Sequence, residues 1–232
     1  MLVLAIDTST KIGTVALYDS TEGVIGEINL NVKQNHSDTI MVVIDTLFKL
    51  SKKEIKDIDK IAVSSGPGSF TGIRIGVAVA KGLAYSLEKP IVGINELDIL
   101  AELAGKRTGK IIAMLDARKE RVFYAIYRYF DSNLVRESEY LDGEIRDIVK
   151  DSSEEILFLG DGAEANKTLI TELMGEKAIF NLKSNNIPRS SILAELSLNK
   201  EDNLFTLEPF YVNKTQAERE KENQEKLKNT YI

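Results

Sequence analysis

The sequence predicts an α/β protein of two lobes, built from duplicated βββαβα units. Two observations lead to this prediction: strand-like apolar segments alternate with helix-like segments, and the same order of segments occurs in both halves of the chain. Each half also opens with an apolar strand that ends in aspartate, at Asp7 and at Asp116. Three leading strands predict an antiparallel meander, and the alternation that follows predicts parallel strands added to the same sheet.

In the first half, the strands are recognised by their Val, Ile and Leu content, and Gly23 supports a tight turn between the second strand and the third. Ser37 opens a helix as an N-cap, and Ile40, Ile44 and Phe48 lie on one face of that helix. In chain order we expect strands at 2–7, 12–19 and 23–31, a helix at 37–51, a strand at 59–64, a helix at 71–87, a strand at 91–94 and a helix opening at Asn95.

The second half repeats this order. We expect strands at 110–116, 121–129 and 134–140, a helix near 142–150, a strand at 156–160, a helix at 163–174, a strand at 178–180 and a helix after Pro188. The boundary is predicted near Gly105–Gly109, which gives lobes 1–105 and 106–213 and a tail 214–232 of mixed charge. This duplicated arrangement resembles the superfamily of actin, Hsp70 and sugar kinases (the ASKHA fold).

Composition excludes several classes of function. The net charge is −6 and no basic stripe is visible, so we do not expect this chain alone to bind a nucleic acid tightly. The chain has no cysteine and a single histidine, His36, so we expect no metal site of the zinc or iron type. No apolar run is long enough to span a bilayer, and Asp7 comes too early for a signal peptide. We therefore expect a cytoplasmic protein without membrane contact.

The loop after the first strand contains the candidate phosphate-binding residues Asp7, Thr8 and Thr10. Ser9 stands where a glycine would let the backbone approach a phosphate, so the alternative is that these residues only end a strand in a hairpin. The corresponding loop of the second half, 116–121, contains no glycine and is the poorer candidate.

A glycine-rich segment, Ser64–Gly76, joins a strand to the helix 71–87. It could hold an anion at the start of the helix, or it could be a tight turn; it is not a Walker A motif. The helix itself has small residues at every fourth position and apolar residues around most of its circumference, so it should be buried on more than one side. The small side chains would pack either on the helix's own sheet or against a partner helix. They are Gly72, Gly76, Ala80 and Ala84.

The chain resembles the TsaB (YeaZ) family over about residues 1–218. The resemblance rests on motifs in family order, which are Ile6–Ser9, His36–Ser37, Gly66–Gly76, Asp116–Arg118, Gly160–Gly162, Pro209–Tyr211 and Gln216–Glu218. It implies a non-catalytic subunit required to form the threonylcarbamoyl group on adenosine 37 of tRNAs. Such a subunit binds and activates a paralogous TsaD-type transferase together with a TsaE-type ATPase. It contacts tRNA only as part of this complex.

The resemblance also implies that pairing runs through the two helices at 37–51 and 71–87, and we expect a homodimer when the chain is alone. TsaD-like enzymes carry a His-x-x-x-His metal pair, whereas here Ile40 follows His36 at that spacing, so neither a metal site nor catalytic residues are expected. No cofactor is expected on the chain alone, and a nucleotide at the partner interface is left open. The predicted interface residues are His36, Ile40, Met41, Ile44, Phe48, Gly72, Arg74, Gly76, Val77, Ala80 and Ala84.

Two polar residues have alternative interpretations. We expect His36 to be a helix-cap or interface residue rather than a general base, and Arg74 to form a structural salt bridge rather than to bind a ligand phosphate. Two other functions are weighed against the subunit role. One is an independent ATP-binding phosphotransferase or ATPase that uses Asp7, Thr8 and Thr10. The other is a peptidase, which the absence of cysteine and of a nucleophile elbow argues against.

Overall fold

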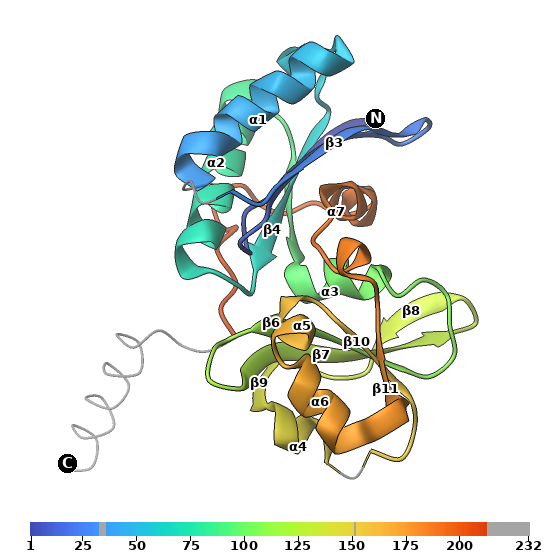
Figure 1. The fold of residues 1–232 in the computed structure, drawn as a ribbon. Helices are drawn as coiled ribbons and strands as arrows, with labels where there is room; N and C mark the ends of the chain where they lie inside the picture. The colour runs from blue at the N-terminus through green and yellow to red at the C-terminus, as the bar shows by residue number, and fades with distance from the viewer. Residues whose placement is uncertain (33–35, 151, 213–232) are drawn as a thin grey trace, which may run out of the picture.

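The computed structural model describes residues 1–32, 36–150 and 152–212, and these form two lobes, each with its own sheet (Figure 1). The predicted two-lobed fold is confirmed. The charged tail predicted at 214–232 lies outside the described residues. Within the described part of the chain, no helix has the length and the apolar character needed to cross a membrane.

Lobe 1 is organised around a five-stranded sheet in the order β3–β2–β1–β4–β5. The first three strands form the predicted antiparallel meander, and β4 and β5 are added in parallel. Every residue of β1 is buried, because this central strand is covered on both faces. The strands are β1 (Leu2–Asp7), β2 (Gly13–Asp19), β3 (Gly23–Leu30), β4 (Lys60–Gly66) and β5 (Ile91–Asn95).

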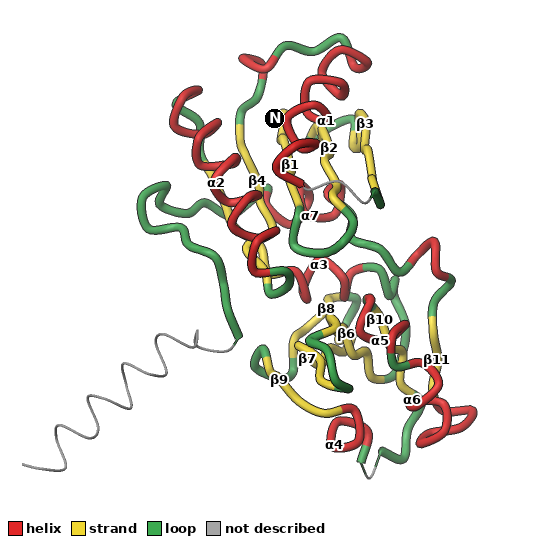
Figure 2. Tube along the Cα trace, turned by 60° about the vertical axis from the view of Figure 1, so that its left-hand side comes forward, coloured by secondary structure: helices red, strands yellow, loops and turns green. Residues whose placement is uncertain are grey.

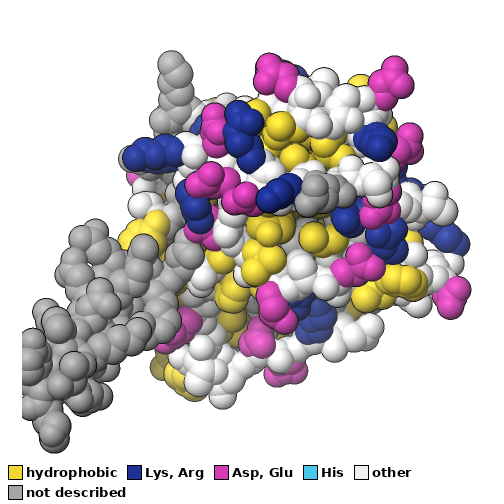
Figure 3. Space-filling view, turned by 90° about the horizontal axis from the view of Figure 1, so that it is seen from below, with side chains coloured by type: hydrophobic (Ala, Val, Ile, Leu, Met, Phe, Trp, Pro, Cys, Tyr) yellow, Lys and Arg dark blue, Asp and Glu magenta, His cyan; other side chains and the backbone are white. Residues whose placement is uncertain are grey.

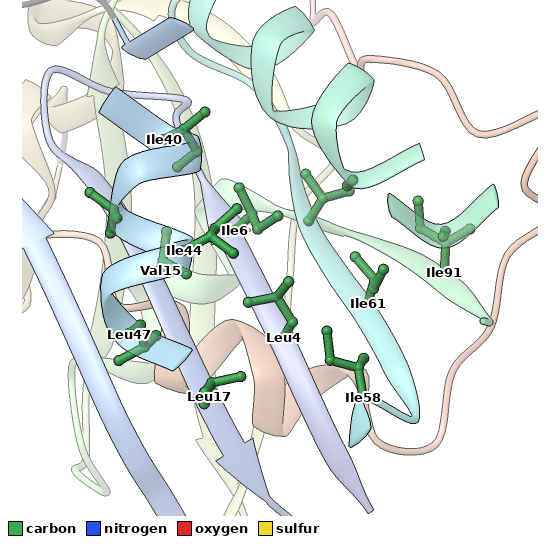
Figure 4. Packing of buried hydrophobic residues seen from close by; sticks show 14 of the residues in the cluster. Leu4, Ile6, Val15, Leu17, Ile40, Ile44, Leu47, Ile58, Ile61 and Ile91 are labelled. Carbon is green, nitrogen blue, oxygen red and sulfur yellow. The ribbon is translucent and has the colours of Figure 1, made fainter. Parts of the chain in front are cut away.

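Two long helices, α1 (His36–Ser51) and α2 (Phe70–Leu87), cover one face of this sheet. Figure 4 shows the α1 side chains Ile40 and Ile44 directed at the apolar side chains of β1 and β2. A short 3₁₀ helix, η1 (Ile55–Asp57), leads from α1 to β4. The core of lobe 1 therefore lies between the helix pair and the sheet.

Lobe 2 has a six-stranded sheet whose main path is β11–β10–β6–β7–β8, with β9 also paired to β7. Short helices cover its faces, and α3 lies where the lobes meet (Figure 2). The strands are β6 (Lys110–Asp116), β7 (Arg121–Phe130), β8 (Asn133–Arg136), β9 (Leu141–Glu144), β10 (Ile156–Leu159) and β11 (Ala178–Phe180). The helices are α3 (Glu96–Glu102), α4 (Ile145–Val149), α5 (Asp161–Ala165), α6 (Lys167–Met174), η2 (Gly175–Lys177) and η3 (Lys183–Asn185).

Lobe 2 departs from the prediction in two places. The strand predicted at 134–140 is divided, because the Ser138 hydroxyl accepts a hydrogen bond from Ile126 N (2.9 Å) and the chain then continues as β9, where a helix was predicted. The helix predicted at 163–174 is interrupted at Asn166, whose side-chain amide donates to Gly162 O (2.8 Å). Both breaks coincide with a side-chain hydrogen bond to the backbone, of the neighbouring strand at Ser138 and of the preceding turn at Asn166, and apolar periodicity does not predict such bonds.

The predicted extent of lobe 2, residues 106–213, needs a correction at its C-terminal end. The last helix, α7 (Ser190–Ser197), packs on the open face of the lobe 1 sheet, with Leu193 and Ala194 in a core shared with β1 and β4. Lys60 of β4 donates to Ser197 O (3.1 Å), Leu198 O (3.0 Å) and Lys200 O (2.7 Å). Lobe 1 therefore consists of the N-terminal segment together with the end of the described chain, and lobe 2 does not extend to residue 213 as predicted.

Candidate functional site

The loop between β1 and β2 turns its first two candidate residues inward. Asp7 is fully buried, and one of its carboxylate oxygens accepts from Ser9 N (2.7 Å). Burial raises the pKa of Asp7 above its ordinary value. The Thr8 hydroxyl, 1% exposed, donates to Gly72 O (2.7 Å). Neither side chain lines the two cavities beside this loop, whereas the third predicted phosphate-binding residue, Thr10, lines both of them.

The glycine-rich segment packs directly on that loop. Ser69 caps α2 by accepting from Gly72 N (3.3 Å), and Ser69 N donates to Ser9 O (2.6 Å). A Cβ atom added at Gly72 would collide with Thr8 O, and one at Gly76 would lie 2.6 Å from Thr8 Oγ1. The glycines of this segment thus let α2 approach the β1–β2 loop of its own lobe.

The loop of the second lobe, between β6 and β7, keeps its aspartate on the surface. Asp116 is exposed, and its carboxylate accepts from Arg118 N (2.9 Å). Asp116 N donates to the Asp161 carboxylate (3.0 Å) at the start of α5. Burial raises the pKa of Asp161; the neighbouring Asp116 carboxylate adds to this rise, and Lys11 of lobe 1 opposes it. Charges of both signs therefore meet where the lobes face each other.

A cleft of about 540 Å³ separates these two loops, with Thr10, Lys11 and Ser69 on one side and Asp116 and Arg118 on the other. Among residues 1–32, 36–150 and 152–212, no three histidine, aspartate or glutamate side chains gather in a way that could hold a metal ion. The cleft can offer hydroxyls, one lysine and one arginine to a small polar group.

A second cavity, of about 740 Å³, lies between the starts of α1 and α2 and is lined by Lys11, Ser37 and Thr71 among others. His36 lies at its wall, where its Nε2 is 2.8 Å from Thr10 O. A Cβ atom added at Gly13 would lie 2.9 Å from His36 Nδ1, so the imidazole ring packs on β2. This position supports a structural rather than a general-base role for His36.

The structure corrects the orientation of most predicted interface residues. Eight of the eleven lie on the inner side of α1 and α2, so they cannot form an outer surface while the helices remain on the sheet. The four small residues of α2 pack within the chain, which agrees with the alternative left open for them. The eight buried residues are Ile40, Ile44, Phe48, Gly72, Gly76, Val77, Ala80 and Ala84.

Different residues lie on the outer sides of the two helices. Met41 is 46% exposed and Arg74 is exposed, whereas His36 is half-buried. Sequence reasoning missed a second row of residues spaced by four on α2, parallel to the buried row. We define the helix face by the exposed residues Met41, Val42, Arg74, Ala78, Gly82 and Tyr85 and the half-buried Ile75, Val79 and Leu83 between them.

Among the residues that the structure describes, Arg74 has no salt-bridge partner of the predicted kind. Its guanidinium carbon lies 3.7 Å from the centre of the Phe70 ring, and its Nε donates to the Tyr211 hydroxyl (2.9 Å). The two aromatic rings are 5.3 Å apart. Arg74 therefore joins the first turn of α2 to the end of the described chain by stacking and by a hydrogen bond.

Two kinds of known protein are similar to this chain in sequence. Residues 11–218 match the family model of TsaD, described as tRNA N6-adenosine threonylcarbamoyltransferase. The chain is also 34% identical over 223 residues to the tRNA threonylcarbamoyladenosine biosynthesis protein TsaB of Bacillus subtilis (strain 168). That alignment covers 94% of this chain and 96% of the relative, so the likeness extends over both lobes.

Solved structures give the fold. YeaZ from Pseudomonas aeruginosa matches with a TM-score of 0.75 at 23% identity, covering 90% of this chain and 99% of that one. The ethanolamine utilization protein EutJ from Carboxydothermus hydrogenoformans matches with a TM-score of 0.51 at 11% identity, covering 84% and 89%. The predicted actin, Hsp70 and sugar-kinase-like fold is confirmed.

Proposed function

This chain belongs to the TsaB family of tRNA threonylcarbamoyladenosine biosynthesis proteins, and we propose that it serves there as a non-catalytic subunit. In this role it binds and activates a TsaD-type transferase, together with a TsaE-type ATPase, so that the threonylcarbamoyl group is formed on adenosine 37 of tRNAs. The observation that carries the proposal is the helix face, an exposed surface of small and apolar residues on α1 and α2.

The composition of the helix face suits contact with another protein. Val42 is 63% exposed and Tyr85 is 70% exposed, and apolar side chains gathered at this level of exposure commonly mark an interaction surface. Ala78 and Gly82 lie one turn apart, and nothing lies within 4 Å of a Cβ atom added at Gly82. A partner backbone can approach α2 closely along this row.

The charge of α2 also favours a protein partner over a nucleic acid. Arg74 and Lys81 are the two charged residues of the helix. The Lys81 ammonium group donates to Leu207 O (2.9 Å), and Arg74 stacks on Phe70. On the far end of lobe 2, Figure 3 shows Lys and Arg side chains interspersed with Asp and Glu. Neither α2 nor the far end of lobe 2 carries the basic stripe that this chain would need to bind tRNA alone. In our proposal the chain therefore contacts tRNA only as part of the complex.

The first loop supports a role without catalysis. Asp7 and Thr8 are the residues that an ATP-using enzyme of this fold would turn toward phosphate, and here both are engaged inside lobe 1. In our proposal the helix face also pairs two copies of the chain when the transferase is absent. The cavity between the starts of α1 and α2 adjoins this face and is the place where a nucleotide at the junction would lie.

The proposal is tested by reconstitution. Leaving this chain out of a mixture of TsaD-type transferase, TsaE-type ATPase, tRNA and threonylcarbamoyl-adenylate is expected to abolish product, because the transferase then lacks its activating subunit. Modified nucleosides are measured by mass spectrometry after digestion of the tRNA. Incubating this chain alone with tRNA and the adenylate is expected to give no product. Full modification without this chain, or modification by this chain alone, would contradict the proposed role.

A further inference from the structure

Two carboxyl groups meet inside lobe 1, below the β1–β2 loop. Asp7 ends β1 and Glu96 opens α3, and both side chains are fully buried. One oxygen of each is satisfied: Asp7 Oδ1 accepts from Ser9 N (2.7 Å), and Glu96 Oε2 accepts from the Ser64 hydroxyl (2.8 Å). Ile6 of β1 pairs with Val63 of β4, so Asp7 at the end of β1 lies beside Ser64, the residue whose hydroxyl holds Glu96. These contacts join β1, β4 and α3 at the place where the lobes meet.

The second oxygen of each carboxyl is unsatisfied. Asp7 Oδ2 and Glu96 Oε1 have no donor among the described residues, and the Ser9 hydroxyl beside them is also unpartnered. Two buried carboxylates that face each other with free oxygens would repel strongly, because no described Lys or Arg supplies a counter-charge. Besides Glu96, the titratable group that acts on Asp7 is His36 of α1, and no described Lys or Arg forms an ion pair with either carboxyl.

We propose that one proton is held between Asp7 Oδ2 and Glu96 Oε1, so that the two carboxyls form a single proton-binding site with one negative charge. The shared proton converts two facing acceptors into a donor and an acceptor, which removes both the unsatisfied oxygens and most of the repulsion. The Ser9 hydroxyl can then donate to the remaining charge. Such a pair titrates as one unit rather than as two independent acids.

A proton fits this place better than a metal ion does. Neither Asp7 nor Glu96 is among the residues lining the two cavities beside the loop, and the described residues supply no third carboxylate or histidine there. A divalent cation takes about six oxygen ligands, which the pair and its neighbouring hydroxyls do not provide. The pair therefore ties the loop to α3, and Asp7 is withdrawn from any ligand in the cleft.

The direction of the pH effect follows from burial. Burial raises the pKa of Glu96 well above its ordinary value, the Asp7 charge raises it further, and burial also raises the pKa of Asp7. The folded chain consequently holds a proton that the unfolded chain releases. Its stability is highest below the ordinary carboxyl pKa and decreases as the pH rises toward the raised pKa of the pair.

The first test is Glu96→Gln. The glutamine amide donates to Asp7 permanently and so replaces the shared proton with one that does not titrate. In urea unfolding between about pH 5 and pH 9, the midpoint of the unmodified chain is expected to fall steadily, and that of E96Q to fall less than half as far. The matched control is Glu176→Gln at an exposed position, which should keep the full slope. Equal slopes for all three proteins would overturn the proposal.

The second test observes the proton itself. The infrared spectrum of the folded chain at neutral pH is expected to show the C=O stretch of one protonated carboxyl, which should be absent from E96Q. In Asp7→Asn the frequency of this band is expected to shift, because an asparagine amide replaces the carboxylate that shares the proton, and an unchanged band would assign the proton to Glu96 alone and contradict the sharing. No band in the unmodified chain, or one bound metal ion per chain by elemental analysis, would overturn the proposal even if both variants failed to fold.

Discussion

Replacing Gly72 with alanine is expected to lower the free energy of unfolding by about 3 kcal/mol or more, the upper end of what overpacking costs. The added Cβ would collide with Thr8 O, a backbone atom that cannot rotate away. The same shift would break the hydrogen bond from the Thr8 hydroxyl to Gly72 O (2.7 Å). Thermal unfolding followed by circular dichroism should show the midpoint lowered by roughly 6–12 °C.

Gly82→Ala is the matched control, since the same substitution is made in the same helix on its outer side. Nothing lies within 4 Å of the added methyl group, so only helix propensity changes, and the free energy of unfolding should rise by up to about 1 kcal/mol. If both variants were equally stable, the helix would not be packed on the β1–β2 loop as described. This comparison tests the packing of α2 independently of any function.

Ala78→Glu is expected to weaken binding to the TsaD-type transferase by about 100-fold, or about 2.7 kcal/mol, while the chain stays folded. Ala78 is exposed near the middle of the helix face, and glutamate is a good helix former, so stability should change little. In the complex, the new carboxylate would be buried against an apolar partner surface without a counter-charge. Isothermal titration calorimetry with the purified transferase measures the loss.

Two other glutamate variants make that experiment specific. Ala165→Glu adds the same charge at an exposed position of α5 in lobe 2, and it should bind the transferase normally. Ala80→Glu places the charge at a fully buried position of α2, and it should fail to fold rather than fail to bind. Normal binding by A78E would exclude the helix face as the docking surface and would leave the packing of α2 untouched.

Much of the fold could be predicted from the sequence, because strand and helix periodicities are local properties. β1, β6 and β11 have the predicted bounds, and α1 and α2 each begin one residue before the predicted start. The duplication could be recognised from the order of elements in each half and from the aspartate that ends each leading strand. The predicted elements were wrong where a single polar side chain marks a break, as at Ser138 in the predicted strand 134–140 and at Asn166 in the predicted helix 163–174.

The orientation of the helices could not be predicted in the same way. α2 has small or apolar residues around almost its whole circumference, so the row that contains Gly76 and the row that contains Gly82 are alike in sequence. The tertiary contacts of Gly72 and Gly76 with Thr8 show which row is buried. The meeting of Asp7 with Glu96 is likewise a tertiary contact between positions far apart in the chain, and a strand ending in aspartate did not indicate that the carboxyl turns inward.

The return of α7 to lobe 1 has a consequence for synthesis of the chain on the ribosome. Val3, Ala5 and Ala62 are covered by Leu193 and Ala194, which are translated after nearly all of lobe 2. Until then the part of the first sheet that α7 covers is exposed, and the Lys60 ammonium group has none of its three carbonyl acceptors. The first lobe to be translated is thus the last to be completed, and a nascent chain that stops before Ser190 exposes a sheet surface to chaperones and to aggregation.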